Sequence, residues 1–168
     1  MGIKRRVLAI LVFSGLATSA IAFGAGATES CLVKACGPGD HAMTYATKVE
    51  PFFACPTREL ASYTSSVIGL ISMQYTLTGT MPNISDKTGE PEYQDQGDKP
   101  NQTRIMLDGL RSRAGVTSFD QAIAICSKGR SRAKVTILNV QKNDEVAYVH
   151  DETKNVNYWL PTSSLNKR

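Results

Sequence analysis

The longest regular pattern of hydrophobic positions lies between residues 56 and 79. Its apolar side chains recur every three or four residues, the spacing of one face of an α-helix. The members of this stripe are Leu60, Tyr63, Val67, Ile68, Ile71 and Tyr75. Pro56 suits the first position of a helix, and Gly79 suits the residue after its end. The pattern therefore predicts a long helix across this segment.

Two shorter segments have the same spacing. Residues 41–49 place their apolar side chains on one face, and Asp40 precedes them as a candidate N-cap. Residues 102–114 form a second such stripe, and Gly115 follows it as a stop signal. Both segments are predicted to be helical.

A third short helix is predicted over residues 118–126. Ser118 and Gln121 form a capping box, the clearest helix start in the chain. Cys126 then falls on the same face as the apolar positions that follow Ser118. That placement favours a buried sulfur with a partner in another part of the core.

Beyond Gly129 the hydrophobic period changes from 3.6 to 2. Alternating positions predict strands at residues 135–140, 146–150 and 156–160, separated by turn-forming residues. Helices followed by a meander of strands indicate an α+β fold with an antiparallel sheet.

Residues 80–101 show neither period. Prolines and glycines interrupt them, and the segment is longer than an ordinary passive connection. Its charged side chains, which we expect to be solvated, are Asp86, Lys87, Glu90, Glu92, Asp95, Asp98 and Lys99. We predict a flexible loop that is either mobile or used in binding.

The start of the chain has the pattern of a secretory signal peptide. Lys4, Arg5 and Arg6 precede an apolar run over residues 7–22, and small residues follow. Cleavage is expected after Ala27, with Ala22 as the alternative. A retained membrane anchor is disfavoured because the apolar run is shorter than the ~20 residues that span a bilayer. We therefore predict a periplasmic or secreted protein.

Export changes the meaning of the net charge. The full chain carries +4, but three of these charges lie in the predicted signal peptide, which leaves about +1 for residues 28–168. Nucleic-acid binding needs a broad basic surface, so we exclude it as a general function. No second apolar stretch is long enough to span a membrane once the signal is removed.

All four cysteines lie after the predicted cleavage site. An even number in an exported chain indicates two disulfides, for which three connectivities are possible. We favour Cys31–Cys36 together with Cys55–Cys126, because Cys55 and Cys126 adjoin helical segments that must pack together. The longer link would close a loop whose constraint stabilises the fold by on the order of 4 kcal/mol.

The end of the chain resembles a bacterial SH3-like (SH3b) domain. Tyr158, Trp159, Leu160 and Pro161 form an aromatic and hydrophobic strand that leads into a turn, and Leu165 follows. The resemblance covers residues 130–167, although only three strands are expected there and such barrels have five or more. It implies a module that binds wall peptides or protein partners.

These patterns predict an α+β protein with three parts. A signal peptide is expected at residues 1–27 and a disulfide-linked helical region at residues 28–128, with the flexible loop at 80–101. A small antiparallel SH3-like meander is expected at residues 129–168.

Alternate basic residues form the most specific polar pattern of the mature chain. In extended backbone they would lie on one side, about 7 Å apart, and could contact an acidic partner. The members of this basic ladder are Lys128, Arg130, Arg132 and Lys134. A solvated strand entry that prevents edge-to-edge association is the alternative interpretation.

Aromatic residues supply the second candidate contact. Tyr158 and Trp159 are adjacent, so their side chains should face opposite ways, and Tyr148 lies on the neighbouring strand. One exposed ring could stack on a ligand, whereas packing in the core is the alternative.

We find no catalytic motif and expect no cofactor. Cys31, Cys36 and His41 have a ligand-like spacing, and His150 could supply a fourth ligand, but exported thiols oxidise, so no metal site is predicted. A Cys–His nucleophile would need a free thiol.

The predicted function is that of a non-enzymatic binding protein of the bacterial envelope. A secretion or conjugation accessory, or an inhibitor or immunity protein, would fit these features. Its partner would be a protein, contacted through the basic ladder and the aromatic residues. A peptidoglycan-binding module and a small hydrolase are the alternatives.

Overall fold

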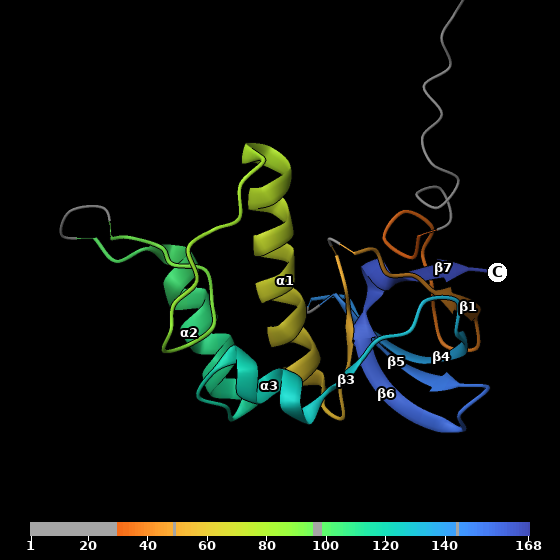
Figure 1. The fold of residues 1–168 in the computed structure, drawn as a ribbon. Helices are drawn as coiled ribbons and strands as arrows, with labels where there is room; N and C mark the ends of the chain where they lie inside the picture. Colours follow the sequence, from red (N-terminus) through yellow and green to blue (C-terminus); the bar gives the residue numbers. More distant parts are fainter. Residues whose placement is uncertain (1–29, 49, 96–98, 144) are drawn as a thin grey trace, which may run out of the picture.

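The computed structural model describes residues 30–48, 50–95, 99–143 and 145–168. Helices gather at one side of the molecule and an antiparallel sheet at the other, with α1 (Arg58–Thr78) between them (Figure 1). The prediction of an α+β fold is confirmed. The predicted signal peptide, residues 1–27, lies outside the described residues.

Five strands form the main sheet, and each pairs antiparallel with its neighbours. Their order across the sheet is β6-β5-β4-β1-β7. In chain order they are β1 (His41–Thr44), β4 (Lys134–Gln141), β5 (Val146–Asp151), β6 (Val156–Pro161) and β7 (Leu165–Lys167). A 3₁₀ turn, η1 (Thr162–Ser164), separates the last two. The three predicted strands are confirmed, and two further strands extend the sheet.

Strand β1 corrects the helix predicted over residues 41–49. Ala42 and Thr44 are both buried in the sheet half of the molecule. The buried Thr44 hydroxyl is satisfied, because it accepts from Ala133 N–H and donates to Arg130 C=O. The inward alternation includes a polar threonine, so a hydrophobicity pattern does not reveal it. The sheet thus takes strands from both sides of the boundary predicted at residue 129.

The other predicted helices are confirmed, with small shifts at their ends. Helix α1 is capped by the Thr57 side chain, which accepts from Leu60 N–H, so Pro56 lies just outside the helix. Helices α2 (Gln102–Ala114) and α3 (Phe119–Ile125) begin after asparagine and serine caps. None of the helices in the described part of the chain combines the length and apolar character needed to cross a membrane.

Both favoured disulfides are present. Cys31–Cys36 closes a short loop, and Cys55–Cys126 joins the start of α1 to the end of α3. Beside the second link, β2 (Phe53–Ala54) pairs with β3 (Ser127–Lys128) as a small separate sheet. Cys55 also pairs through its backbone with Trp159 of β6. The disulfide therefore ties the helices to the edge of the main sheet.

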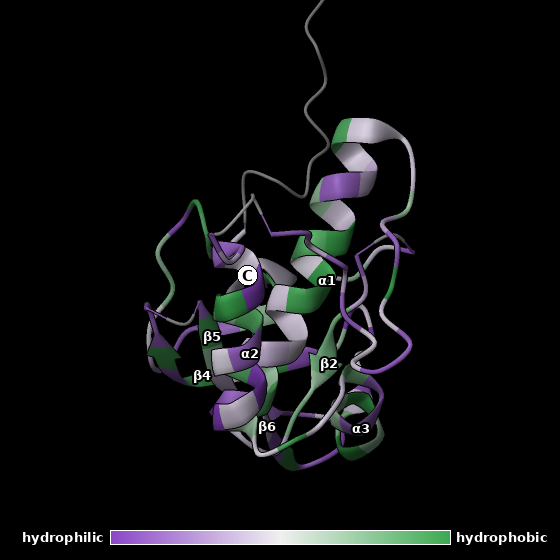
Figure 2. Cartoon of the chain, turned by 90° about the vertical axis from the view of Figure 1, so that its left-hand side faces the viewer, coloured by the Kyte–Doolittle hydropathy of each residue, from purple (hydrophilic) through white to green (hydrophobic). Residues whose placement is uncertain are grey.

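The core has two parts. One lies among the helices and contacts Trp159, and the other lies within the sheet and contacts Tyr158. Hydrophobic residues colour β2, β4 and β5 in Figure 2, whereas α2 presents mostly polar residues in that view. Helix α1 packs on α2 at one side and on β6 at the other, so it joins the two parts.

The segment predicted as a flexible loop is anchored at its middle. Glu90 is only 5% exposed, accepts from the Tyr63 hydroxyl at 2.6 Å and pairs with Arg111. Phe119 N–H donates to Thr88 C=O at 2.7 Å. Glu90 is thus a buried structural carboxylate, which corrects the prediction that it is solvated.

Candidate functional site

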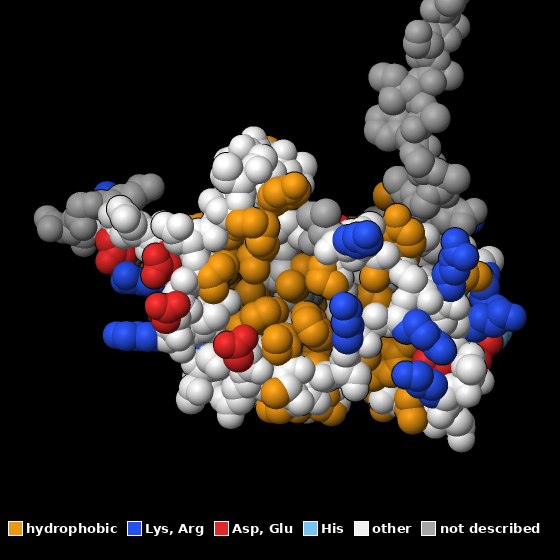
Figure 3. Space-filling view, viewed as in Figure 1, with side chains coloured by type: hydrophobic (Ala, Val, Ile, Leu, Met, Phe, Trp, Pro, Cys, Tyr) orange, Lys and Arg blue, Asp and Glu red, His pale blue; other side chains and the backbone are white. Residues whose placement is uncertain are grey.

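A cleft of about 250 Å³ lies where the β2–β3 sheet meets the edge of β6. Its lining residues are 54–56, 125, 127–130, 151, 154 and 156–158. In Figure 3, Lys and Arg side chains gather over the sheet half of the face shown, beside apolar side chains over α1. We call the cleft lined by these residues at the junction of the β2–β3 sheet and β6 the basic cleft.

Close backbone packing places the basic residues at this cleft. Gly129 donates its N–H to Phe52 C=O at 2.8 Å, and a Cβ at position 129 would lie 2.3 Å from the Phe52 ring. Only glycine fits this approach without movement of the ring. Lys128 and Arg130 flank Gly129 and both line the cleft.

Three cations line the cleft, and among the described lining residues they face a single carboxylate. Lys128, Arg130 and Lys154 are exposed, whereas Asp151 is 2% exposed. Asp151 Oδ1 accepts from the backbone N–H groups of Thr153 and Lys154, each at 2.9 Å, and Oδ2 lies 3.7 Å from Arg130. Because three cations face one carboxylate, the cleft has an excess of positive charge that suits an anionic ligand.

Tyr158 adds a phenol group to the same cleft. Burial, and next the negative charge of Asp151, raise the pKa of Tyr158 to about 12, against the opposite influence of Arg130. A hydrogen bond with Asp151 contributes to the same shift, so the phenol stays protonated at neutral pH with Asp151 as its partner.

The basic ladder is divided by the fold. Lys128 and Arg130 reach the cleft, but Arg132 has a φ of 62° and so interrupts the extended backbone. Lys134 begins β4, where it pairs with Met43 of β1. The expectation that all four side chains follow one another along one side is therefore wrong.

The aromatic residues have separate positions. Tyr148 and Trp159 stack with ring centroids 5.0 Å apart, and Trp159 packs on the helical core. Tyr158 packs on the sheet core and lines the cleft. Tyr158 and Trp159 pack on different parts of the core, as their predicted opposite orientation requires, but both are half-buried, whereas one of them was expected to lie in the core.

Sequence reasoning did not identify Lys154 and Asn157 as residues of the site. Both belong to the turn and strand after β5. They line the cleft together with Lys128 at the place where the Cys55–Trp159 bridge and the Cys55–Cys126 link hold the β2–β3 sheet beside β6. The favoured disulfide could place Lys128 near Cys55, but no local signal indicates its proximity to Lys154.

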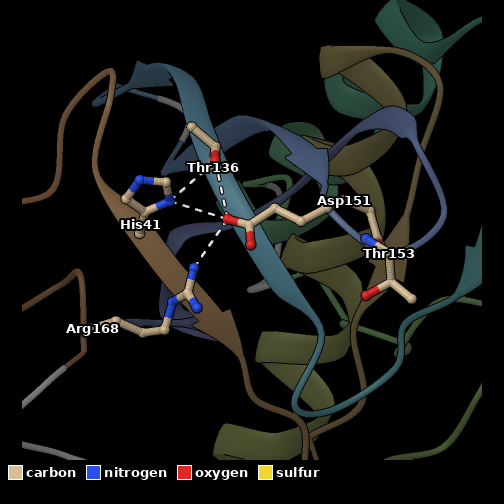
Figure 4. A network of polar contacts seen from close by, with 6 residues as sticks. His41, Thr136, Asp151, Thr153 and Arg168 are labelled. Carbon is tan, nitrogen blue, oxygen red and sulfur yellow. Dashed lines mark hydrogen bonds and ion pairs between the residues drawn. The ribbon is translucent and has the colours of Figure 1, made fainter.

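A second polar network surrounds Glu152, the residue that follows Asp151 in the turn after β5. Glu152 Oε1 lies 3.0 Å from His41 Nδ1, 3.1 Å from Thr136 Oγ1 and 2.9 Å from Arg168 NH2 (Figure 4). The contacts join β5's end to β1, β4 and the C-terminus. Hydrogen bonds from His41 and Thr136, together with the Arg168 charge, lower the pKa of Glu152.

This network predicts a contribution to acid stability. Because folding lowers the pKa of Glu152, the stabilisation is present above the usual carboxyl pKa of about 4.3 and is lost as the pH falls below it. Glu152→Gln should therefore reduce the difference in urea midpoint between pH 7 and pH 3. Glu92→Gln, at an exposed carboxylate of the loop, is the matched control. An unchanged pH dependence in the Glu152 variant would contradict the role.

The described residues contain no group of three or more His, Cys, Asp or Glu side chains placed to hold a metal ion. Cys31 and Cys36, considered above as ligands, are bonded to each other. His150 Nδ1 instead lies 2.8 Å from Asn157 Oδ1.

Comparison of the chain with protein-family models, curated proteins and solved structures finds no match.

Proposed function

We propose that this chain is an exported, non-enzymatic binding protein of the bacterial envelope that contacts a protein partner through the basic cleft. The observation that carries the proposal is the juxtaposition of Lys128, Arg130 and Lys154 with the protonated Tyr158 in one open cleft. Groups of this kind bind anions by charge-assisted hydrogen bonds. The two disulfides and the N-terminal pattern support export.

The proposal includes an SH3-like architecture for the sheet. Its support is a sheet of five strands in which β1 pairs with the last strand, β7, and in which the aromatic β6 leads into the short turn η1. Helices α1 to α3 then form an insertion between β1 and β4 in the chain. The insertion carries Cys55 and Cys126, whose disulfide lies beside β6, and Cys55 lines the cleft.

A binding role agrees with the state of the cysteines. All four are in disulfides, so a Cys–His nucleophile has no support in this structure. Peptidoglycan stays the alternative ligand and is distinguished by experiment.

The test compares partner capture by the exported protein and by charge-reversed variants. The mature chain is incubated with envelope proteins and, separately, with purified sacculi. For the Lys128→Glu/Arg130→Glu variant we expect recovery of a discrete protein partner to fall about tenfold or more, because attraction becomes repulsion. The Lys34→Glu/Lys142→Glu variant changes the net charge equally at exposed sites outside the cleft and should retain the partner.

Two outcomes would overturn the proposal. The first is recovery that is the same for the cleft variant and the wild type. The second is co-sedimentation with sacculi that depends on Lys128 and Arg130, with no protein partner retained, which would identify a wall-binding module.

A further inference from the structure

The edge of β6 is open where it enters the basic cleft. Trp159 N–H donates to Cys55 C=O at 2.8 Å, and Cys55 N–H donates to Trp159 C=O at 2.9 Å, so the Trp159 backbone faces away from β5. Backbone groups alternate in direction along a strand, and the register with β5 is unbroken here. The N–H and C=O of Asn157 therefore point to the same outer side as those of Trp159.

The chain itself does not continue along this edge. Antiparallel pairing of Cys55 with Trp159 would bring residue 57 opposite Asn157, but Thr57 instead caps α1. Pro56 and Asn157 both line the cleft that this departure leaves. Among the described residues, none forms a hydrogen bond with the outward N–H or C=O of Asn157.

The side chain of Asn157 is turned toward β5 and does not bond with the outward backbone N–H and C=O of the same residue. Its Oδ1 lies 2.8 Å from His150 Nδ1 on β5. Asn157 thus offers a backbone donor and acceptor to an incoming extended chain, the geometry used when a peptide adds a strand to a sheet edge. The opening is short, because β6 begins at Val156 and Asn155 has a φ of 55°.

The charge around the opening selects the ligand. Lys128 and Arg130 come from the β2–β3 side and Lys154 from the β5–β6 turn, and all three line the cleft with Asn157. In an extended peptide, alternate side chains point to the same side. Acidic residues at alternate positions of such a peptide would therefore present their carboxylates together on one side, as ligands for the cations that line the cleft with Asn157.

We infer that the basic cleft binds an extended acidic peptide segment of its partner, which pairs with the backbone of Asn157 and extends the short strand begun by Cys55. This inference rests on the proposed function and names the ligand class of the same cleft. Backbone pairing supplies the orientation, and the cations supply the preference for carboxylate side chains.

The probe is a labelled heptapeptide that alternates threonine and glutamate, with acetylated and amidated ends. Its counterparts carry glutamine or lysine in place of glutamate. We expect anisotropy titrations of the full exported protein to show binding of the glutamate peptide. The glutamine peptide should bind about tenfold more weakly and the lysine peptide not measurably, because only carboxylates match the cations. Binding should also weaken as salt is raised.

Strand addition is tested separately from charge. Asn157→Pro removes the outward N–H while leaving the β5 pairing, since proline is tolerated at a sheet edge. We expect affinity for the glutamate peptide to fall about tenfold, which corresponds to about 1.4 kcal/mol. N-methylation of alternate peptide bonds in the probe tests the same pairing with the wild-type protein, should the proline variant not fold. The amide of Asn157 should also exchange with solvent more slowly when the peptide is bound.

The outcomes separate the two proposals. If Lys128→Glu/Arg130→Glu abolishes partner capture, but N-methylation leaves peptide affinity unchanged and the Asn157 amide gains no protection, strand addition is wrong and the proposed function stands. Equal binding of the glutamate and glutamine peptides overturns the acidic ligand class. If charge reversal leaves partner capture unchanged, the proposed function falls and this inference with it.

Discussion

Removing the Cys55–Cys126 disulfide should lower the free energy of unfolding by about 4 kcal/mol, against about 2 kcal/mol for Cys31–Cys36. The two links span 71 and 5 residues of sequence, and a longer closed loop restricts the unfolded chain more strongly. The experiment compares urea unfolding of Cys55→Ala/Cys126→Ala with that of Cys31→Ala/Cys36→Ala. Each variant is its partner's control for the general effect of losing a disulfide.

The longer link also has consequences for the basic cleft. Cys55 is fully buried and bonded through its backbone to Trp159, and Lys128 follows Cys126 by two residues. Loss of this disulfide should therefore weaken ligand binding at the cleft, while loss of Cys31–Cys36 should leave it unchanged. Equal destabilisation by the two variants would contradict the dependence on loop length, and equal binding would contradict the positioning role.

The helices were predictable because their signals are local. Ser118 accepts from Gln121 N–H at the start of α3, and Gly79 ends α1 with a φ of 70°. Both features depend only on residues within one turn, so the sequence carries them in full. The strands after Gly129 were recognisable for the same reason, because their alternation is local.

Strand β1 and the loop before α2 depend on distant contacts. The backbone of residues 41–44 pairs with β4 and β7, which lie far along the chain, and its buried Thr44 conceals the alternation. Glu90 resembles a solvated carboxylate until Tyr63 and Arg111 are brought to it by the packing of α1 on α2. Local propensity carries no information about either arrangement.

The residues of the basic cleft were predictable only in part. Lys128, Arg130 and Tyr158 were identified as candidate contact residues, and the structure brings them to one cleft. Lys154 and the open edge at Asn157 arise from the way the β2–β3 sheet meets β6. The predicted Cys55–Cys126 pairing is enough to place Lys128 near Cys55. The proximity of Lys154 and Asn157 depends on the pairing of Cys55 with Trp159, which the sequence does not indicate.

The buried ion pair between Glu90 and Arg111 should contribute strongly to the stability of the fold. Its side chain is 7% exposed and that of Arg111 is 18% exposed, and Arg111 also contacts Asp108 on the same helix. The Tyr63 hydroxyl donates to the other Glu90 oxygen at 2.6 Å. Burial, and next the hydrogen bond to Glu90, raise the pKa of Tyr63, so the phenol stays a donor. A buried carboxylate with two partners thus joins the loop to both α1 and α2.

Arg111→Met should therefore lower the free energy of unfolding by about 3 kcal/mol, because it leaves the buried carboxylate of Glu90 without its cation. Glu90→Gln should cost less, since the amide oxygen still accepts from Tyr63 and no buried charge is left unpaired. The double variant should then be more stable than Arg111→Met alone, because the unpaired charge is gone. Urea unfolding of the four proteins of this cycle measures the coupling. Additive losses, or a cost below about 1 kcal/mol for Arg111→Met, would mean that the pair behaves as a solvated surface contact, which such small values typify.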